Sequence, residues 1–152
     1  MKKLSLLLIL LISNIMFSQN VKELRTLLKT GESSEKSAKI LIEKSSTAYR
    51  NSKEPIYGGF LAVGKFFMAK HAFNPLKKMS YFNEGKRTME QALKADPKNL
   101  EIRLMRLITQ EKTPSILGYN QQIKEDRNFL AQEYKNTNDE DLKLYIKDYL
   151  KL

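Results

Sequence analysis

The densest apolar stretch of the chain lies between Leu100 and Gln110 and predicts a buried central helix. At about 100° per residue its apolar positions cover an arc of roughly 200°, which is wider than the roughly 100° stripe typical of a surface helix. These positions are Leu100, Ile102, Leu104, Met105, Leu107 and Ile108. Asn99 is a good N-cap for this helix, and Pro97 cannot continue the helix before it. We therefore expect neighbouring helices to cover this segment on two or three sides.

The rest of the chain also repeats its apolar residues at helical spacing, and we find no strand pattern in it. Gly31 is expected to end the first of these helices, and Asn138 is expected to cap the last. The predicted helices cover residues 21–30, 34–50, 55–73, 76–94, 100–110, 123–134 and 139–150. Because no low-complexity linker interrupts them, we interpret residues 19–152 as one domain. The predicted fold class is all-α, with about six to seven helices stacked as antiparallel hairpins.

The segment at residues 55–73 is apolar on nearly all sides, with Lys65 as the only charge before Lys70. Its apolar run of about 14 residues is short for a membrane span, which needs about 20. We therefore prefer a buried helix to a membrane span. Small residues within it would let neighbouring helices approach closely, at some cost in helix propensity. These residues are Gly58, Gly59, Ala62 and Gly64.

Residues 1–18 have the parts of a secretory signal peptide. Lys2 and Lys3 form a basic start, an almost wholly apolar run covers residues 4–12, and Ser18 offers a small residue for cleavage. The run is too short for a standard transmembrane helix, and an uncleaved anchor is the second interpretation. We expect cleavage near Ser18 and export of the protein, either to a periplasm or out of the cell.

The balance of charge is basic, with 27 lysine and arginine residues against 17 aspartate and glutamate residues and a formal charge of +10. Removal of Lys2 and Lys3 with the signal peptide would lower this charge to +8. Such a surface favours an anionic partner, such as an acidic protein, a lipid or polysaccharide surface, or nucleic acid, but it also serves solubility alone. The chain has no cysteine, which excludes disulfides, cysteine-based zinc sites, a thiol nucleophile and the lipid-attachment cysteine of a bacterial lipoprotein.

Two helical segments carry spacings that resemble the tetratricopeptide repeat (TPR). The first segment has a large aromatic, an aliphatic, a glycine and an aromatic residue at the family spacing. The second has small, large and small residues before a terminal proline. The matching residues are Phe60, Val63, Gly64 and Phe67, followed by Gly85, Met89, Ala92 and Pro97. The two halves lie about nine residues further apart than in the family, a difference that longer helices would absorb.

The resemblance implies a short TPR-like α-solenoid whose first helices line a concave face for a protein or peptide partner. Carried over by register, that face would include Gly58, Leu61, Ala62 and Lys65 from the first hairpin, and Glu101, Leu104, Met105 and Ile108 from the next. Because the predicted helices are few, the chain itself could fill this groove and leave a compact globule.

Past the terminal proline the sequence departs from the family pattern. Arg103, Arg106 and Gln110 occupy the positions of aromatic and aliphatic residues, and Asp126 falls near a partner position that is normally small. We therefore expect a partly buried ion network of Arg103 and Arg106 with Asp126, because a guanidinium can bind a carboxylate through two parallel hydrogen bonds. Further carboxylates for this network are Glu101 and Glu125. Structural stabilisation, recognition of an anionic ligand and catalysis are the three roles that the sequence leaves open.

We predict no catalytic residue, no metal site and no cofactor. His71 is the only histidine, so a histidine-rich metal site is excluded, and no nucleophile stands at a recognisable spacing from it. The acidic run at residues 139–141 suits the start of a helix better than a calcium loop, because it lacks the glycine and the ligand spacing of such a loop. Basic pairs without interleaved aromatic residues give little support for nucleic-acid binding.

The sequence thus predicts an exported, non-catalytic helical-repeat protein that acts as a binding or scaffold module for a protein or peptide in the cell envelope. After signal cleavage it would not be transmembrane. The second hypothesis is a basic envelope-associated protein that binds anionic polysaccharide or lipid surfaces by charge, which salt would weaken. An enzyme of unrecognised type is the third.

Overall fold

A computed structural model describes residues 21–152, and this part of the chain consists of helices and loops without a β-strand. Residues 21–31 form the first described helix. It is followed by α2 (Glu35–Ser52), α3 (Pro55–His71), α4 (Pro75–Ala95), α5 (Leu100–Lys112), the short turn η1 (Ser115–Leu117), α6 (Ile123–Glu133), the short turn η2 (Tyr134–Asn136) and α7 (Glu140–Leu150). The all-α class with about six to seven helices is therefore confirmed. The predicted signal peptide at residues 1–18 lies outside the described residues.

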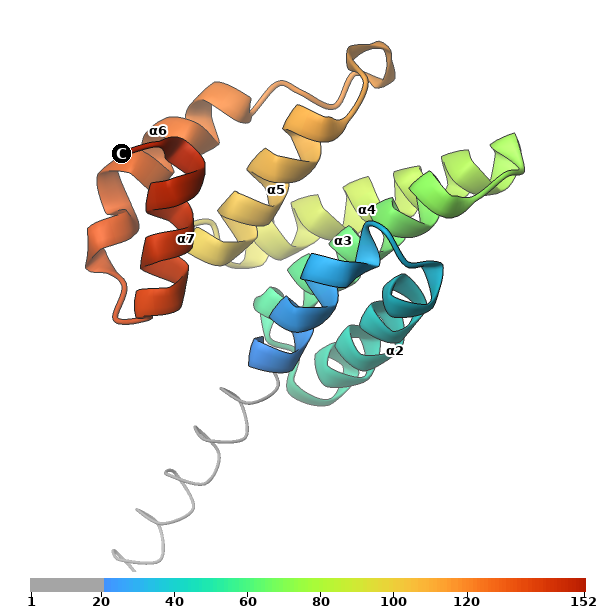
Figure 1. Cartoon of the computed structure of the whole chain (residues 1–152), viewed down its shortest axis with the longest axis horizontal. Helices are drawn as coiled ribbons and strands as arrows, with labels where there is room; N and C mark the ends of the chain where they lie inside the picture. Colours follow the sequence, from blue (N-terminus) through green and yellow to red (C-terminus); the bar gives the residue numbers. More distant parts are fainter. Residues whose placement is uncertain (1–20) are drawn as a thin grey trace, which may run out of the picture.

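From α2 to α7, each helix packs against the next one in the chain (Figure 1). α3 and α4 form a long antiparallel pair, and α2 packs against α3. α5 contacts both α3 and α4, α6 packs on α5, and α7 packs on α6. The turn between α3 and α4 forms one end of the molecule, while α6 and α7 lie toward the other. A solenoid of the TPR type stays a prediction.

The apolar core consists of two main clusters that meet at α5. Its residues Ile102 and Met105 belong to the cluster around α3, which also contains Leu24, Leu41, Phe60 and Met89. Its residues Leu104 and Leu107 belong to the cluster built with α6 and α7, which also contains Leu130 and Ile146. The prediction that this helix is covered on several sides is therefore confirmed.

α3 is the most deeply covered of the longer helices, because its small residues allow its neighbours to come close. A methyl group on Gly64 would lie 2.8 Å from Ile42 of α2, and one on Gly85 of α4 would lie 3.1 Å from the carbonyl oxygen of Ala62. These distances are too short for an unstrained contact, so the glycines set the spacing of the three helices. Among the described residues, no helix combines the length and the apolar character that a membrane crossing requires.

One of two predicted helix ends is wrong. Asp139, not Asn138, caps α7, because its carboxylate accepts a hydrogen bond of 3.0 Å from the backbone N–H of Leu142. The first described helix ends at Gly31 as predicted. It does not end in the left-handed conformation, however, since the only glycine with positive φ among the described residues is Gly118. Gly31 is instead small for packing reasons, because a methyl group there would meet the ring of Phe67 at 2.6 Å.

Candidate functional site

Arg103, Arg106 and Asp126 come together between α5 and α6. Arg106 donates from Nε and a terminal nitrogen to the two oxygens of Asp126, at 2.7 and 2.8 Å, in the parallel two-bond geometry. Arg103 donates a third hydrogen bond of 2.8 Å to the same carboxylate and another of 2.8 Å to Glu125. The side chain of Asp126 has no exposed surface. One fully buried carboxylate therefore accepts three charge-assisted hydrogen bonds from two arginines of one helix.

Two further residues, to which the sequence did not point, extend this network. Glu90 of α4 accepts a hydrogen bond of 3.0 Å from Arg106 and one of 2.7 Å from the hydroxyl of Tyr119. Burial would lower the pKa of Arg106, but the hydrogen bonds and charges of Asp126 and Glu90 outweigh it and raise that pKa above its ordinary value. Burial and the bond to Glu90 also raise the pKa of Tyr119, which therefore stays a neutral donor.

The remaining polar atoms around the network are also paired. Arg103 donates a hydrogen bond of 2.7 Å to the carbonyl oxygen of Pro97 and lies 4.2 Å from the ring centre of Phe129. Gln110 donates to the side chain of Gln122 at 2.8 Å and accepts from its backbone N–H at 3.2 Å. Within residues 21–152, every buried side-chain nitrogen and oxygen has a hydrogen-bond partner. The buried polar atoms of the network are thus paired within the chain, and the Asp126 carboxylate has no surface open to a substrate or an anion.

The residues assigned by register to a concave binding face are largely covered by the chain itself. Five of the eight are buried: Gly58, Ala62, Glu101, Leu104 and Met105. Leu61, Lys65 and Ile108 are half-buried, and Lys65 forms an ion pair of 2.6 Å with Glu84. Of these eight residues, only Glu101 lines the open groove described below, so the register does not produce a groove along the assigned face.

A second ion network joins the first described helix to α5 and α7. Arg25 donates two hydrogen bonds to Glu101, at 2.6 and 2.8 Å, and a third of 2.7 Å to Asp139. These bonds hold the pKa of Arg25 above its ordinary value, and against the effect of burial they lower the pKa of Asp139. Arg25 was missed as the shared partner of Glu101 and Asp139, because 76 and 114 residues separate it from these two acceptors and no local spacing pairs them.

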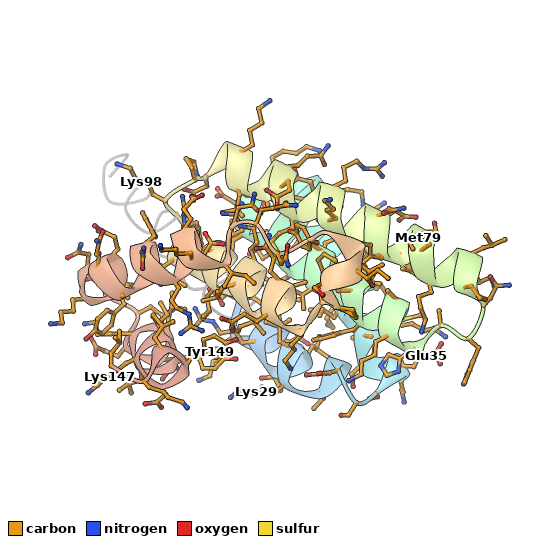
Figure 2. The ribbon with its side chains drawn as sticks, turned by 90° about the horizontal axis from the view of Figure 1, so that it is seen from above. Lys29, Glu35, Met79, Lys98, Lys147 and Tyr149 are labelled. Atoms are coloured by element: carbon orange, nitrogen blue, oxygen red, sulfur yellow. The ribbon has the colours of Figure 1, made fainter. Side chains whose placement is uncertain are left out.

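An open groove of about 640 Å³ lies beside this second network, where the starts of α3, α5 and α7 meet the first described helix. Apolar side chains from all four helices line it, and charged side chains of both signs stand among them. The lining residues are Val21, Lys22, Arg25, Glu54, Pro55, Ile56, Asp96, Lys98, Asn99, Leu100, Glu101, Thr137, Asp139, Asp141 and Leu142. Figure 2 shows one of them, Lys98, at the edge of the molecule beside the end of α4.

The other candidate side chains have structural contacts. A ring nitrogen of His71 lies 3.0 Å from the carbonyl oxygen of Gly31, at the end of a neighbouring helix. Asp139 caps α7 and binds Arg25, which accounts for both of its oxygens. No group of three or more acidic, histidine or cysteine side chains in the described part of the chain could hold a metal ion.

In comparison with known proteins, the chain matches no protein-family model, no curated protein and no solved structure.

Proposed function

We propose that this protein is an exported, non-catalytic binding module that engages a polypeptide segment in the cell envelope through the groove at the starts of α3, α5 and α7. The observation that carries the proposal is this groove, which holds about 640 Å³ and is open to solvent. Sites for small molecules enclose most of the ligand surface, whereas an open groove suits a segment of another chain. The network at Asp126 argues against catalysis by that carboxylate, because it is fully buried and already accepts three hydrogen bonds from two arginines.

The lining of the groove suits a polypeptide. Its floor is apolar, with Val21, Ile56 and Leu142 almost fully covered. Lysine and carboxylate side chains stand at its rim, an arrangement that resembles the apolar centre and polar edge of protein interfaces. Among these, the side chains of Glu54 and Asp141 form no ion pair with another described residue and are exposed, so they are free to meet a partner.

Export is the second part of the proposal, and it rests on the basic start and the apolar run of residues 1–18. The measurement is the mass of the protein recovered from the envelope or the medium of the cell that makes it. A chain that starts just after Ser18 supports export with cleavage. A chain that keeps Lys2 and Lys3 and stays in the cytoplasm contradicts it.

The groove is tested by capture of partners from the envelope fraction, followed by affinity measurement with the purified partner. The variant Glu54→Lys/Asp141→Lys reverses two rim charges and is expected to weaken binding at least tenfold. The matched control, Glu43→Lys/Asp148→Lys, makes the same change at exposed positions outside the groove and should bind normally. Equal affinity of both variants for the partner would contradict binding through the groove. Binding that vanishes in every variant at several tenths molar salt would favour the charge-driven hypothesis instead.

A further inference from the structure

The turn between α3 and α4 lies at one end of the molecule (Figure 1). It exposes three apolar side chains to solvent. Phe73 is fully exposed, with a relative exposure of 101%, and Leu76 follows at 82%. Met79 stands one turn further along α4 with 44% of its surface exposed, and Figure 2 shows it near the same end of that helix. Exposed apolar residues are common singly, but three within seven positions at a projecting end form a patch that calls for a partner.

The same turn is uniformly basic. No aspartate or glutamate occurs between residues 70 and 83, while lysines occupy positions 70, 77 and 78. Lys70 pairs with Glu32 at 3.1 Å. Lys77 and Lys78 are exposed, and neither forms an ion pair with any of the described residues. Two uncompensated positive charges therefore flank the exposed Phe73 and Leu76.

The backbone holds these side chains in a fixed arrangement. Asn74 caps α4 by accepting hydrogen bonds from the N–H groups of Leu76 and Lys77, at 2.9 and 3.1 Å, and Pro75 fixes the first residue of the helix. The N–H of Ala72 still donates to the carbonyl oxygen of Met68 at 2.9 Å, so α3 ends just before Phe73. A partner would thus meet an ordered patch rather than a loop that must first be ordered.

We propose that this turn docks on an anionic lipid bilayer, with Phe73 and Leu76 entering the interface and Lys77 and Lys78 contacting the headgroups. The shape favours a bilayer over an acidic protein, because a projecting apolar end fits a deformable interface without a matching cavity. Lysine stems can lie along the apolar boundary while their amino groups stay among the headgroups. The inference is independent of the groove, which lies at the starts of α3, α5 and α7 rather than at the turn that joins α3 to α4.

The test uses a reporter placed in the turn itself. Vesicle binding by the whole chain would not be enough, because the apolar run of residues 4–12 could bind vesicles on its own. The chain has no tryptophan, so Phe73→Trp introduces a single fluorescent reporter at a fully exposed position. With vesicles of phosphatidylglycerol and phosphatidylethanolamine, we expect its emission to move to shorter wavelength and to be quenched by brominated lipids. Vesicles of phosphatidylcholine alone should give little change. Leu76→Trp provides a second reporter in case the first alters the turn.

Two matched controls make the outcome specific. Ile116→Trp places the same reporter at another highly exposed position, on η1, and should not respond. In the Phe73→Trp background, Lys77→Gln/Lys78→Gln should weaken the response by about fivefold per lysine. Lys124→Gln/Lys147→Gln on α6 and α7 should leave it unchanged. The proposal is overturned if neither reporter on the turn responds to anionic vesicles, or if Ile116→Trp responds equally. It is also overturned if an acidic polypeptide, but not a vesicle, moves the emission.

Discussion

Arg106 of α5 and Asp126 of α6 meet through two parallel hydrogen bonds in a place that solvent does not reach. The pair is directional, because two nitrogen–oxygen contacts fix both the distance and the rotation of one helix relative to the other. Arg103, one turn earlier on α5, adds a third bond to the same carboxylate. The register of α5 against α6 is therefore set by charge as well as by apolar packing.

Replacement of Asp126 by asparagine should be strongly destabilising. The change keeps the shape of the side chain but leaves Arg103 and Arg106 without their shared carboxylate, which for a buried pair costs about 3–5 kcal/mol of unfolding free energy. Urea unfolding followed by circular dichroism measures this loss. The control is Glu125→Gln, since the Glu125 side chain is 61% exposed and its pair should contribute under about 1 kcal/mol. Similar losses in both variants would contradict a dominant role for the buried contact.

Replacement of Arg25 by glutamine should loosen the contact of the first described helix with α5 and α7. Glu101 is nearly buried and would lose two hydrogen bonds to a charged partner, at a cost of about 2 kcal/mol. The control is Lys22→Gln, one turn earlier at an exposed position, which should stay within about 0.5 kcal/mol of the unchanged protein. A loss no larger than that of the control would mean that apolar packing alone holds this helix.

Replacement of Gly85 by alanine should destabilise the protein even though alanine is the better helix former. The new methyl group would stand 3.1 Å from the backbone oxygen of Ala62 and 3.3 Å from the ring of Phe66, and strain of about 1–3 kcal/mol outweighs a propensity gain of about 1 kcal/mol. Gly59→Ala makes the matched test, because its nearest contact, at 2.6 Å, is the terminal methyl of Met105. That flexible side chain can turn away, so thermal unfolding should change little.

Acid should weaken the fold in a defined range of pH. The bond to Arg103 lowers the pKa of Glu125, and for Asp139 the bond to Arg25 overcomes the opposing effect of burial and lowers the pKa as well. Groups with a lowered folded-state pKa stabilise the fold above their unfolded values of about 4 and lose that contribution as the pH falls further. Melting temperatures should therefore drop below about pH 4.

In the Arg25→Gln variant, the fall in melting temperature at acid pH should be smaller. The reason is that the pKa of Asp139 is no longer lowered by the bond to Arg25. An unchanged dependence of melting temperature on pH in that variant would contradict a role for the bond between Arg25 and Asp139. Lys22→Gln serves again as the control, because its loss of charge leaves the bond between Arg25 and Asp139 intact.

Most of the fold could be predicted from local signals. Pro55 begins α3 and Asn99 caps α5 as expected, and the apolar residues of 100–110 indicated a helix covered on several sides. The caps were harder, because Asn138 and Asp139 are adjacent residues that are both suited to the role. Only the tertiary contact with Arg25 distinguishes the residue that takes it.

The candidate site could be predicted only in part. The proximity of Arg103 and Arg106 to Asp126 followed from placing polar residues at positions that normally face a partner helix. Glu90 and Tyr119 could not be found in this way, because they join the network from α4 and from the segment between η1 and α6. The positions assigned to a concave face were likewise covered by the chain itself, since the helices pack more closely than an open array would allow.

α5 belongs to both apolar clusters, so the molecule consists of two parts that join at this helix. The two parts differ in their stability against local unfolding. If α6 and α7 lift away, Leu104 and Leu107 are uncovered and the guanidinium groups of α5 lose their carboxylate, but the cluster around Phe60 keeps its own contacts. Local opening of this kind follows boundaries between cooperative units. Amide protons in the last two helices should accordingly exchange with solvent ahead of those in α3, and the chain should pass through a partly folded species as it is denatured.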